Sequence, residues 1–197
     1  MIESQRLILR KVTMQDADDI FEYACDEETG PRAGWPPHKN IDDTKEILTK
    51  WLEYDNHEQN FAIVLKETNK VVGTIGYTNL VKKLENERNY IARELINKGS
   101  TVFEIGITVG KAYWGKGIGT ESLKSMIDYL FETLGADVVL TLHFEQNVAS
   151  EKIQEKNNLK ILGQFERQDK WFNTDCTTMI IRGMTKFEWL KEKQFGK

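Results

Sequence analysis

The spacing of apolar residues predicts alternating strands and helices along the chain. Apolar and polar residues alternate over 5–11 (QRLILRK), which is the pattern of a half-buried strand. Over 13–24 the apolar residues instead recur three and four positions apart, as in a helix, and Thr13 suits its N-cap. A second helix is predicted over 42–55. The prolines and glycines of 30–40 predict irregular structure between these two helices.

The rest of the chain continues this alternation. Helices are predicted over 117–134 and 149–156, and the charged segment 81–101 is interpreted as an inserted helix over 84–96. Hairpins and strand–helix–strand units therefore occur together, and we expect one mixed α/β domain over 1–197, with 81–101 inserted between strands. The further predicted strands are 61–66, 71–79, 102–109, 138–144, 160–167 and 178–184.

Composition narrows the classes of partner. The chain has 197 residues, 40% of them hydrophobic, which is enough to bury a substantial core. A net charge of −4 argues against a protein that neutralises many nucleic-acid phosphates. No apolar run approaches the roughly 18–20 residues that span a bilayer, and the opening MIESQRLILRK lacks a signal-peptide core. We therefore expect a cytoplasmic protein with neither nucleic-acid nor membrane partners.

The cysteines and histidines do not indicate a metal site. Cys25 and Cys176 share no short spacing, and the three histidines are scattered along the chain. The same scatter gives little support to a catalytic Cys–His pair. We therefore expect neither a metal site nor a Cys–His nucleophile.

A glycine cluster precedes the helix predicted over 117–134. Residues 113–121 read YWGKGIGTE, with glycine at 115, 117 and 119. Because glycine in an element interior costs about 0.5–1 kcal/mol relative to alanine, such a cluster indicates a backbone that closely approaches something. The N–H groups and dipole at a helix start favour an anion there. The cluster therefore predicts a phosphate site.

Two nucleotide-binding patterns fit this cluster poorly. Residues 110–117 (GKAYWGKG) nearly have Walker A spacing, but Gly117 replaces the Ser or Thr that binds Mg²⁺. The dinucleotide pattern G-x-G-x-x-G fails as well, because Ser122 stands where its third glycine would be. Neither a P-loop nor a Rossmann site is favoured.

A third pattern fits better and extends over nearly the whole chain. The strand EIGITV (104–109) followed by YWGKGIGTE resembles the pyrophosphate loop of the GNAT acetyltransferase superfamily, with Trp114 where many members carry Gln or Arg. Four further segments resemble, in order, those of its ribosomal-protein N-terminal (Rim-type) branch. They are SQRLILR (4–10), GWPPHKNIDDTKEIL (34–48), NVASEKIQEKNNL (147–159) and DCTTMIIRGMTKFEW (175–189).

This resemblance implies a fold, a reaction and a set of cofactor contacts. The implied fold is the GNAT fold, a mostly antiparallel, twisted sheet with splayed central strands, flanked by helices. The implied reaction is direct transfer of the acetyl group of acetyl-CoA to a primary amine. The implied acetyl-CoA-binding residues are Ile107, Thr108, Val109, Trp114, Gly115, Lys116, Gly117, Ile118, Gly119, Thr120, Asn147 and Ser150.

The resemblance also implies catalytic roles. Glu104 occupies the position of the glutamate that deprotonates the acceptor, and the alternative is a charge that merely starts a strand. Ser150 would lie near the sulfur and protonate the thiolate, whereas helix capping is the alternative reading for Ser150 and Asn147. The tyrosine acid of many members is absent, because Gln154 stands at its position.

The sequence says least about the amine that accepts the acetyl group. Trp35 and Asp175 resemble residues of the acceptor side, although Trp35 could equally cover the core edge. Holding an amine neutral at pH 7 costs about 1–1.4 kcal/mol for an α-amine and more than about 4 for a lysine side chain. A peptide or protein N-terminus is therefore the expected acceptor, and a polyamine or aminoglycoside-like amine is the alternative.

Two other functional classes also stay open for this protein: a catalytically silent CoA-binding module and a P-loop phosphate binder. The segment 81–101 could form a lid, a contact in a homodimer or a solvated surface helix. The acceptor and the oligomeric state are not determined by the sequence.

Overall fold

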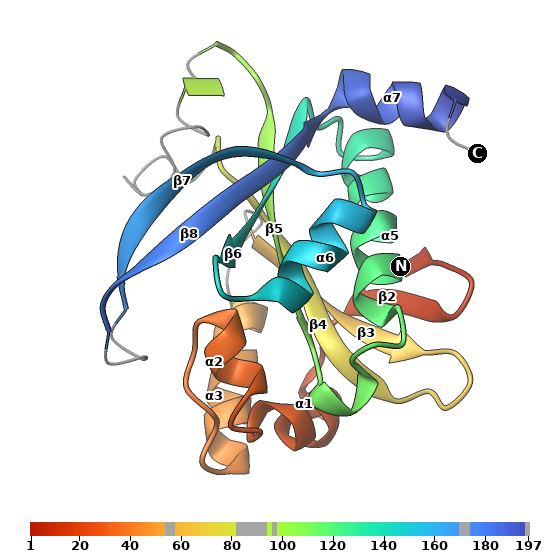
Figure 1. Ribbon diagram of the computed structural model, residues 1–197. Coiled ribbons are helices and arrows are strands. Elements are labelled where there is room, and N and C mark those ends of the chain that lie inside the picture. Colours follow the sequence, from red (N-terminus) through yellow and green to blue (C-terminus); the bar gives the residue numbers. More distant parts are fainter. Residues whose placement is uncertain (54–57, 82–93, 96–97, 170–173, 196–197) are drawn as a thin grey trace.

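The computed structural model describes residues 1–53, 58–81, 94–95, 98–169 and 174–195 (Figure 1). In this part of the chain, eight strands form one sheet in the order β1-β2-β3-β4-β5-β6-β8-β7. The strands are β1 (Ile2–Glu3), β2 (Leu7–Lys11), β3 (Glu58–Leu65), β4 (Val71–Asn79), β5 (Val102–Val109), β6 (Val138–Phe144), β7 (Lys160–Asp169) and β8 (Thr174–Thr185). The helices are α1 (Ala17–Ala24), α2 (Thr29–Ala33), α3 (Ile41–Glu53), α5 (Ile118–Glu132), α6 (Val148–Lys156) and α7 (Lys186–Phe195), with 3-10 turns η1 (Met14–Asp16) and η2 (Lys111–Tyr113).

Helices cover both faces of the sheet. On one face, Leu123, Met126 and Leu130 of α5 pack into a core built on β2–β6. On the other, Ile20 of α1 and Leu48 of α3 pack against β3 and β4. Figure 1 shows α1–α3 gathered at one end of the sheet, while α5 and α6 lie side by side. This layering is the mixed α/β, mostly antiparallel fold that the sequence predicts.

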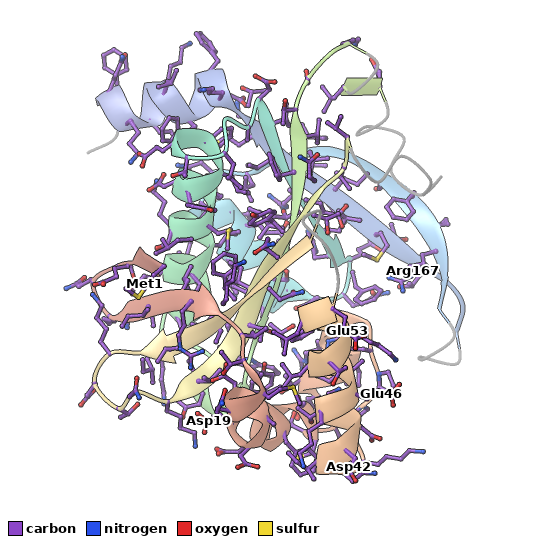
Figure 2. All side chains as sticks on the ribbon, turned by 180° about the vertical axis from the view of Figure 1, so that it is seen from behind. Met1, Asp19, Asp42, Glu46, Glu53 and Arg167 are labelled. Atoms are coloured by element: carbon purple, nitrogen blue, oxygen red, sulfur yellow. The ribbon has the colours of Figure 1, made fainter. Side chains whose placement is uncertain are left out.

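The acidic residues of α3 follow from its amphipathic pattern. Thr44 and Leu48 are buried toward the sheet, whereas Asp42, Glu46 and Glu53 point outward (Figure 2). The helix thus buries one stripe and leaves its charges in water, as is typical of a surface helix.

The centre of the sheet opens between β5 and β6. These two strands pair in parallel, and their register ends at Ile105↔Thr141. Yet β5 continues to Val109 and β6 to Phe144. The two strands therefore separate beyond Ile105, and the predicted splay is confirmed.

Most predicted elements are confirmed, but the segment 30–40 is not wholly irregular. Thr29–Ala33 forms the short helix α2, and this part of the prediction was wrong. Pro31 is tolerated because the first-turn N–H groups of a helix have no internal partner anyway. Gly34 ends α2 with a left-handed φ of 88°.

Two further differences concern helices. The sequence patterns did not predict α7, whose exposed Phe187 and Phe195 obscure its periodicity. The predicted helix over 84–96 lies almost wholly outside the described residues. Within the described part of the chain, no helix combines the length and the apolar character needed to cross a membrane.

Candidate active site

A cavity of about 560 Å³ lies where β5 and β6 separate. Its wall combines β4 and β5 with the turn after β5, the ends of β6 and α2, and the first turns of α5 and α6. Glu104, the 106–109 stretch of β5, Trp114, the glycines of the cluster, Asn147 and Ser150 all lie on this wall. The structure thus brings most of the predicted site residues together.

The strand β5 turns main-chain groups toward the gap. Gly110 N–H donates to Val72 O at 2.9 Å, which fixes the positions at which β5 exchanges hydrogen bonds with β4. Because these positions alternate in an antiparallel pair, the N–H and C=O groups of Ile107 and Val109 point away from β4. They face the side on which pairing with β6 has ended. This geometry suits a ligand that pairs with β5 as a strand would.

Trp114 already forms a hydrogen bond with one of these main-chain groups, the Val109 carbonyl. Its indole Nε1–H donates to Val109 O at 2.7 Å, and the Arg32 guanidinium lies 4.9 Å from the ring centre. The tryptophan therefore braces the turn against the end of β5 and against α2. Two N–H groups, of Ile107 and Val109, and the Ile107 carbonyl remain directed at the gap.

The glycines of the cluster have two different functions. Gly115 and Gly117 adopt left-handed φ values of 73° and 77°, which cost an ordinary residue about 1–2 kcal/mol. Gly119 has no such angle, but a Cβ there would lie 2.6 Å from Ile153 Cδ1 of α6. The first two glycines shape the turn, and the third lets α5 approach α6.

The start of α5 leaves its N–H groups to a ligand. Gly117 is the N-cap, and no side chain caps this helix. The first four N–H groups of a helix need partners from outside it, and their dipole favours an anion. Thr120 is half-buried on the cavity wall, whereas the side chain of Ile118 is buried in the core, so Ile118 has only main chain to offer a ligand.

Lys116 lies differently from its neighbours. It is not among the residues that form the described wall, and its Nζ lies 5.2 Å from the Tyr113 ring centre. Its carbonyl accepts a hydrogen bond from Arg6. Direct contact of the Lys116 side chain with the cofactor stays a prediction.

Glu104 lies on the cavity side of β5. Glu104, Gly106 and Thr108 line the cavity, whereas Phe103 and Ile105 are buried in the core beneath α5. This is the alternation expected of a strand. The carboxylate is half-buried, at the level of the sheet where β5 and β6 begin to separate.

The start of α6 is capped by a side chain. Asn147 Oδ1 accepts from Ser150 N at 3.1 Å, so the predicted capping role is present. The other end of the same amide donates to Arg32 O at 2.9 Å, which ties α6 to α2. A contact between Asn147 and pantetheine stays a prediction.

A buried chain of hydrogen bonds ends at Ser150. Thr141 Oγ1 donates to Gln154 Oε1 at 2.8 Å, and Gln154 Nε2 donates to Ser150 Oγ at 3.0 Å. Thr141 and Gln154 are each only 2% exposed. Ser150 Oγ thus accepts one hydrogen bond, and its own O–H points away from Gln154 and can act as a donor.

In the sequence, Gln154 stands out only as the residue that replaces a tyrosine. Its spacing of four from Ser150 was the available signal, since such pairs meet on one helix face. Nothing in the sequence pointed to Thr141.

His143 is another titratable residue on the cavity wall. It is 4% exposed, and its Nδ1 lies 3.0 Å from Phe144 O. Burial lowers the pKa of His143 below its usual 6.5. The imidazole is therefore neutral at pH 7, and its second nitrogen, Nε2, is buried.

The two predicted acceptor residues have different outcomes. Trp35 is not on the described cavity wall; it packs beside α1 and α3, filling the space that Gly30 leaves. This is a position at the edge of the core, and a role for Trp35 on the acceptor side stays a prediction. Asp175 lies in β8, and its side chain is outside the described residues. The described wall includes the large apolar side chains of Trp51, Phe144 and Met179.

The wall is mostly basic in its charged groups. Among the described residues that form it, Glu104 is the one acid, whereas Arg32, Lys152, Lys156 and Arg167 are basic. Arg167 lies on β7, near the edge of the sheet (Figure 2). Across the described part of the chain, no three His, Cys, Asp or Glu side chains gather as a metal site requires.

Comparison with known proteins identifies the family. Residues 6–160 match the family described as the acetyltransferase (GNAT) domain. The chain belongs to the GNAT acetyltransferase family. GNAT enzymes take the acetyl group from acetyl-CoA, so this chain is an acetyl-CoA-dependent N-acetyltransferase. The matched region includes Glu104, the glycine cluster and Ser150.

Relatives and solved structures agree with this assignment. The GNAT chain is 28% identical over 152 residues to p20, an uncharacterized N-acetyltransferase from Bacillus licheniformis, and the match covers 76% of each chain. A GNAT acetyltransferase structure from Bacillus anthracis matches with a TM-score of 0.75 at 19% identity, over 95% of this chain and 99% of that one. A spermidine N-acetyltransferase from Vibrio cholerae, in complex with CoA and spermine, matches with a TM-score of 0.72 at 18% identity, over 95% and 99% of the two chains. These two structures share the fold.

Proposed function

We propose that this GNAT enzyme acetylates the α-amine of a peptide or protein N-terminus, as the Rim-type branch does, within one domain over 1–197 and in the cytoplasm. The observation that carries the proposal is the charge of the cavity wall. Glu104 is the one acid among its described residues. A single carboxylate is a sufficient base for an α-amine, because the α-ammonium loses its proton near neutral pH.

In the proposed reaction, acetyl-CoA supplies the activated acetyl group and the chain supplies position and proton transfer. The Glu104 carboxylate takes the proton of the acceptor ammonium, directly or through one water. The amine nitrogen then bonds to the acetyl carbon as the carbon–sulfur bond breaks. Main-chain N–H groups of Ile107 or Val109 stabilise the charge on the carbonyl oxygen.

The departing thiolate needs a proton, and Ser150 is the proposed donor. Gln154 donates to the Ser150 oxygen, which leaves the Ser150 proton directed elsewhere. In the proposal, this proton passes to the sulfur, and Ser150 is reprotonated by the second proton that the attacking nitrogen loses as it becomes the amide, directly or through one water. The loop around Gly115 and Gly117, with the free N–H groups of α5, holds the pyrophosphate.

A small-molecule amine is the second candidate acceptor. This candidate is supported by the shared fold of the Vibrio cholerae spermidine N-acetyltransferase. A polyamine, however, carries several positive charges, and the described wall offers one carboxylate beside four basic side chains. We therefore rank the peptide N-terminus first.

A turnover screen tests the acceptor. Free-thiol release from acetyl-CoA would be measured with N-terminal peptides, with peptides blocked at the N-terminus but carrying lysine, and with spermidine and an aminoglycoside. We expect the highest kcat/KM for unblocked peptides. A higher value for spermidine would overturn the acceptor while leaving the reaction intact. Acetyl-CoA binding without turnover on any amine would favour a silent CoA-binding module.

A carboxylate substitution tests the base. Glu104→Gln should lower kcat/KM by roughly 10²–10⁴ while the Kd for acetyl-CoA stays unchanged, since the group acts on the acceptor. Glu46→Gln, on the outer face of α3, is the matched control and should have no effect. Equal activity of Glu104→Gln and the control would rule Glu104 out as the base.

A further inference from the structure

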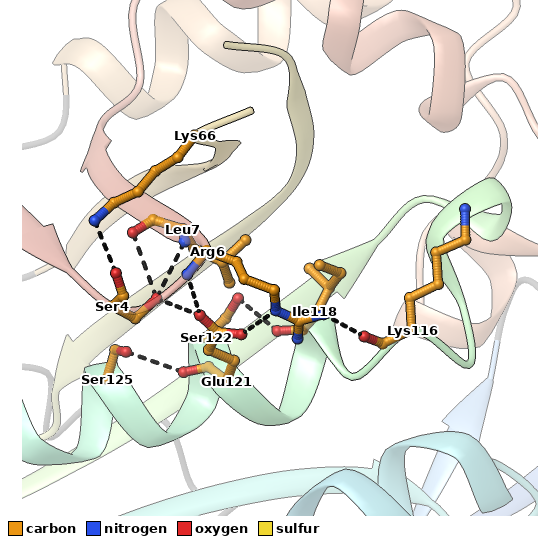
Figure 3. Close-up of polar contacts among 9 residues, drawn as sticks. All are labelled: Ser4, Arg6, Leu7, Lys66, Lys116, Ile118, Glu121, Ser122 and Ser125. Carbon is orange, nitrogen blue, oxygen red and sulfur yellow. Dashed lines mark hydrogen bonds and ion pairs between the residues drawn. The ribbon is translucent and has the colours of Figure 1, made fainter. Parts of the chain in front are cut away.

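The segment before β2 reaches across to the glycine loop. Arg6 Nη1 donates to Lys116 O at 2.9 Å, although the two residues lie 110 positions apart (Figure 3). Arg6 Nε and Arg6 N donate to the two oxygens of Glu121 at 2.7 and 2.8 Å. Ser4 Oγ donates to the same carboxylate at 2.7 Å. We call Ser4, Arg6 and Glu121 the N-terminal clasp.

The clasp sets the orientation of one peptide group in the loop. In a trans peptide the carbonyl of one residue and the N–H of the next point in opposite directions. Arg6 holds the Lys116 carbonyl on its own side, so the Gly117 N–H is turned away from Arg6. Gly117 lies on the cavity wall, whereas Arg6 does not.

The clasp also compensates the negative charge of Glu121, which would disfavour a pyrophosphate at the loop. Glu121 lies in the first turn of α5, where its carboxylate would repel a pyrophosphate. Although partial burial disfavours the charged form, the hydrogen bonds from Arg6 and Ser4 hold the pKa of Glu121 below its usual range. The carboxylate is therefore ionised at pH 7, with the Arg6 guanidinium against it.

Arg6 also leaves little room for a side chain at Gly117. A Cβ at Gly117 would lie 3.2 Å from Arg6 Nη2. The arginine thus lies directly against the turn of the loop, on its outer side.

We propose that Arg6 is a positioning residue for acetyl-CoA: it holds the Lys116–Gly117 peptide in the orientation that binds the pyrophosphate and neutralises Glu121 beside it. The proposal rests on the proposed function of the 114–120 loop as the pyrophosphate site. Arg6 itself acts through the loop and through Glu121.

Three acetyl donors test this role. Acetyl-CoA and acetyl-dephospho-CoA both carry the pyrophosphate, whereas S-acetylpantetheine ends before it. For Arg6→Gln we expect KM to rise about tenfold for the first two donors, with kcat within about twofold. KM for S-acetylpantetheine should be unchanged. An equal rise for all three donors would indicate general distortion, and no rise for any would also overturn the proposal.

A double variant separates the two effects of Arg6. Removing Arg6 alone leaves the Glu121 charge uncompensated beside the pyrophosphate. Arg6→Gln combined with Glu121→Gln should therefore have a lower KM for acetyl-CoA than Arg6→Gln alone. If the double variant is no better than the single one, charge compensation is not part of the role.

Lys66→Ala is the matched control. Lys66 Nζ anchors the same N-terminal segment, through Ser4 O at 2.8 Å and Glu3 at 3.0 Å, without touching the loop. The Lys66→Ala substitution should leave KM unchanged for all three acetyl donors. If the unsubstituted protein shows neither turnover nor binding of acetyl-CoA, the proposed function fails rather than the role of Arg6, and binding of S-acetylpantetheine alone would show that the loop is not the pyrophosphate site.

Discussion

Two helices, α5 and α6, begin close together at the open centre of the sheet, each following one of the separated strands, yet they begin in opposite ways. The helix α5 starts after Gly117, in a left-handed turn, and no side chain caps it. The helix α6 starts after Asn147, whose side chain caps Ser150 N. No side chain occupies the first N–H groups of α5, whereas at α6 the Asn147 side chain occupies one of them.

The difference separates binding from chemistry in our proposal. At α5 the main chain itself is the binding surface, so glycine and the Arg6 contact determine its shape. At α6 the useful group is a side chain, Ser150, oriented by Gln154. Changes at the start of α5 should therefore weaken acetyl-CoA binding, and changes at α6 should mainly affect turnover or stability.

The largest effect is expected for Gly117→Ala. A side chain at a φ of 77° and 3.2 Å from Arg6 would distort the loop. Loss of two charged hydrogen bonds to the pyrophosphate would raise the Kd for acetyl-CoA by roughly 100-fold, measured by isothermal titration. Gly135→Ala is the control, since it has a φ of 68° with open space around it and should share the strain of about 1–2 kcal/mol without changing Kd.

The second prediction concerns the chemistry at α6. Gln154→Leu removes the donor to Ser150, and kcat should fall roughly tenfold while the Kd for acetyl-CoA is unchanged. Gln154→Glu keeps an acceptor for Thr141 but attracts the Ser150 proton, so kcat should fall similarly with less loss of stability. In a Ser150→Ala background, Gln154→Leu should have no further effect on kcat, and additive losses would contradict the link between the two residues.

A smaller effect is expected for Asn147→Ala. Loss of the cap should cost about 1 kcal/mol and lower Tm by about 2–4 °C, measured by calorimetry. Asn147→Asp keeps the cap to Ser150 N and should recover much of this stability, although it cannot donate to Arg32 O. If Asn147→Ala weakened acetyl-CoA binding as strongly as Gly117→Ala, the separation of binding and chemistry between the two helices would be wrong.

The smallest effect concerns pH. The pKa of Glu121 is held below its usual value in the folded protein, mainly by hydrogen bonds that overcome its partial burial. Its stabilisation is therefore present above the unfolded pKa of about 4.3 and is lost as pH falls through the lower, folded value. The Tm of Glu121→Gln should fall less steeply than that of the unsubstituted chain below about pH 5. Parallel Tm curves for the two proteins would contradict this.

The sequence predicted the strands well and the site in outline. Apolar, β-branched runs bounded by turn signals located β4, β5 and β6 to the residue, although burial along these strands does not follow period two. The resemblance of local motifs then placed Glu104, the glycine loop and Ser150 around one cavity. These are short segments whose spacing in the chain carries the signal.

What the sequence did not predict depends on contacts between distant segments. Arg6 meets Lys116 across 110 positions, and Thr141 meets Gln154 between a strand and a helix. The packing of Trp35 against Gly30 is likewise a contact that its loop sequence did not predict. No local pattern records which side chain fills which space once the elements pack.

The close approach of Gly119 to Ile153 has a consequence for how such chains diverge. The two positions share one volume, because a single added methyl at 119 would collide with the end of the isoleucine. A descendant that acquires alanine at 119 must then turn the flexible end of Ile153 aside or carry a shorter residue at 153. A change at 119 is thus expected to be felt at 153 through evolutionary time, independently of any pressure that the cofactor exerts on Gly115 and Gly117.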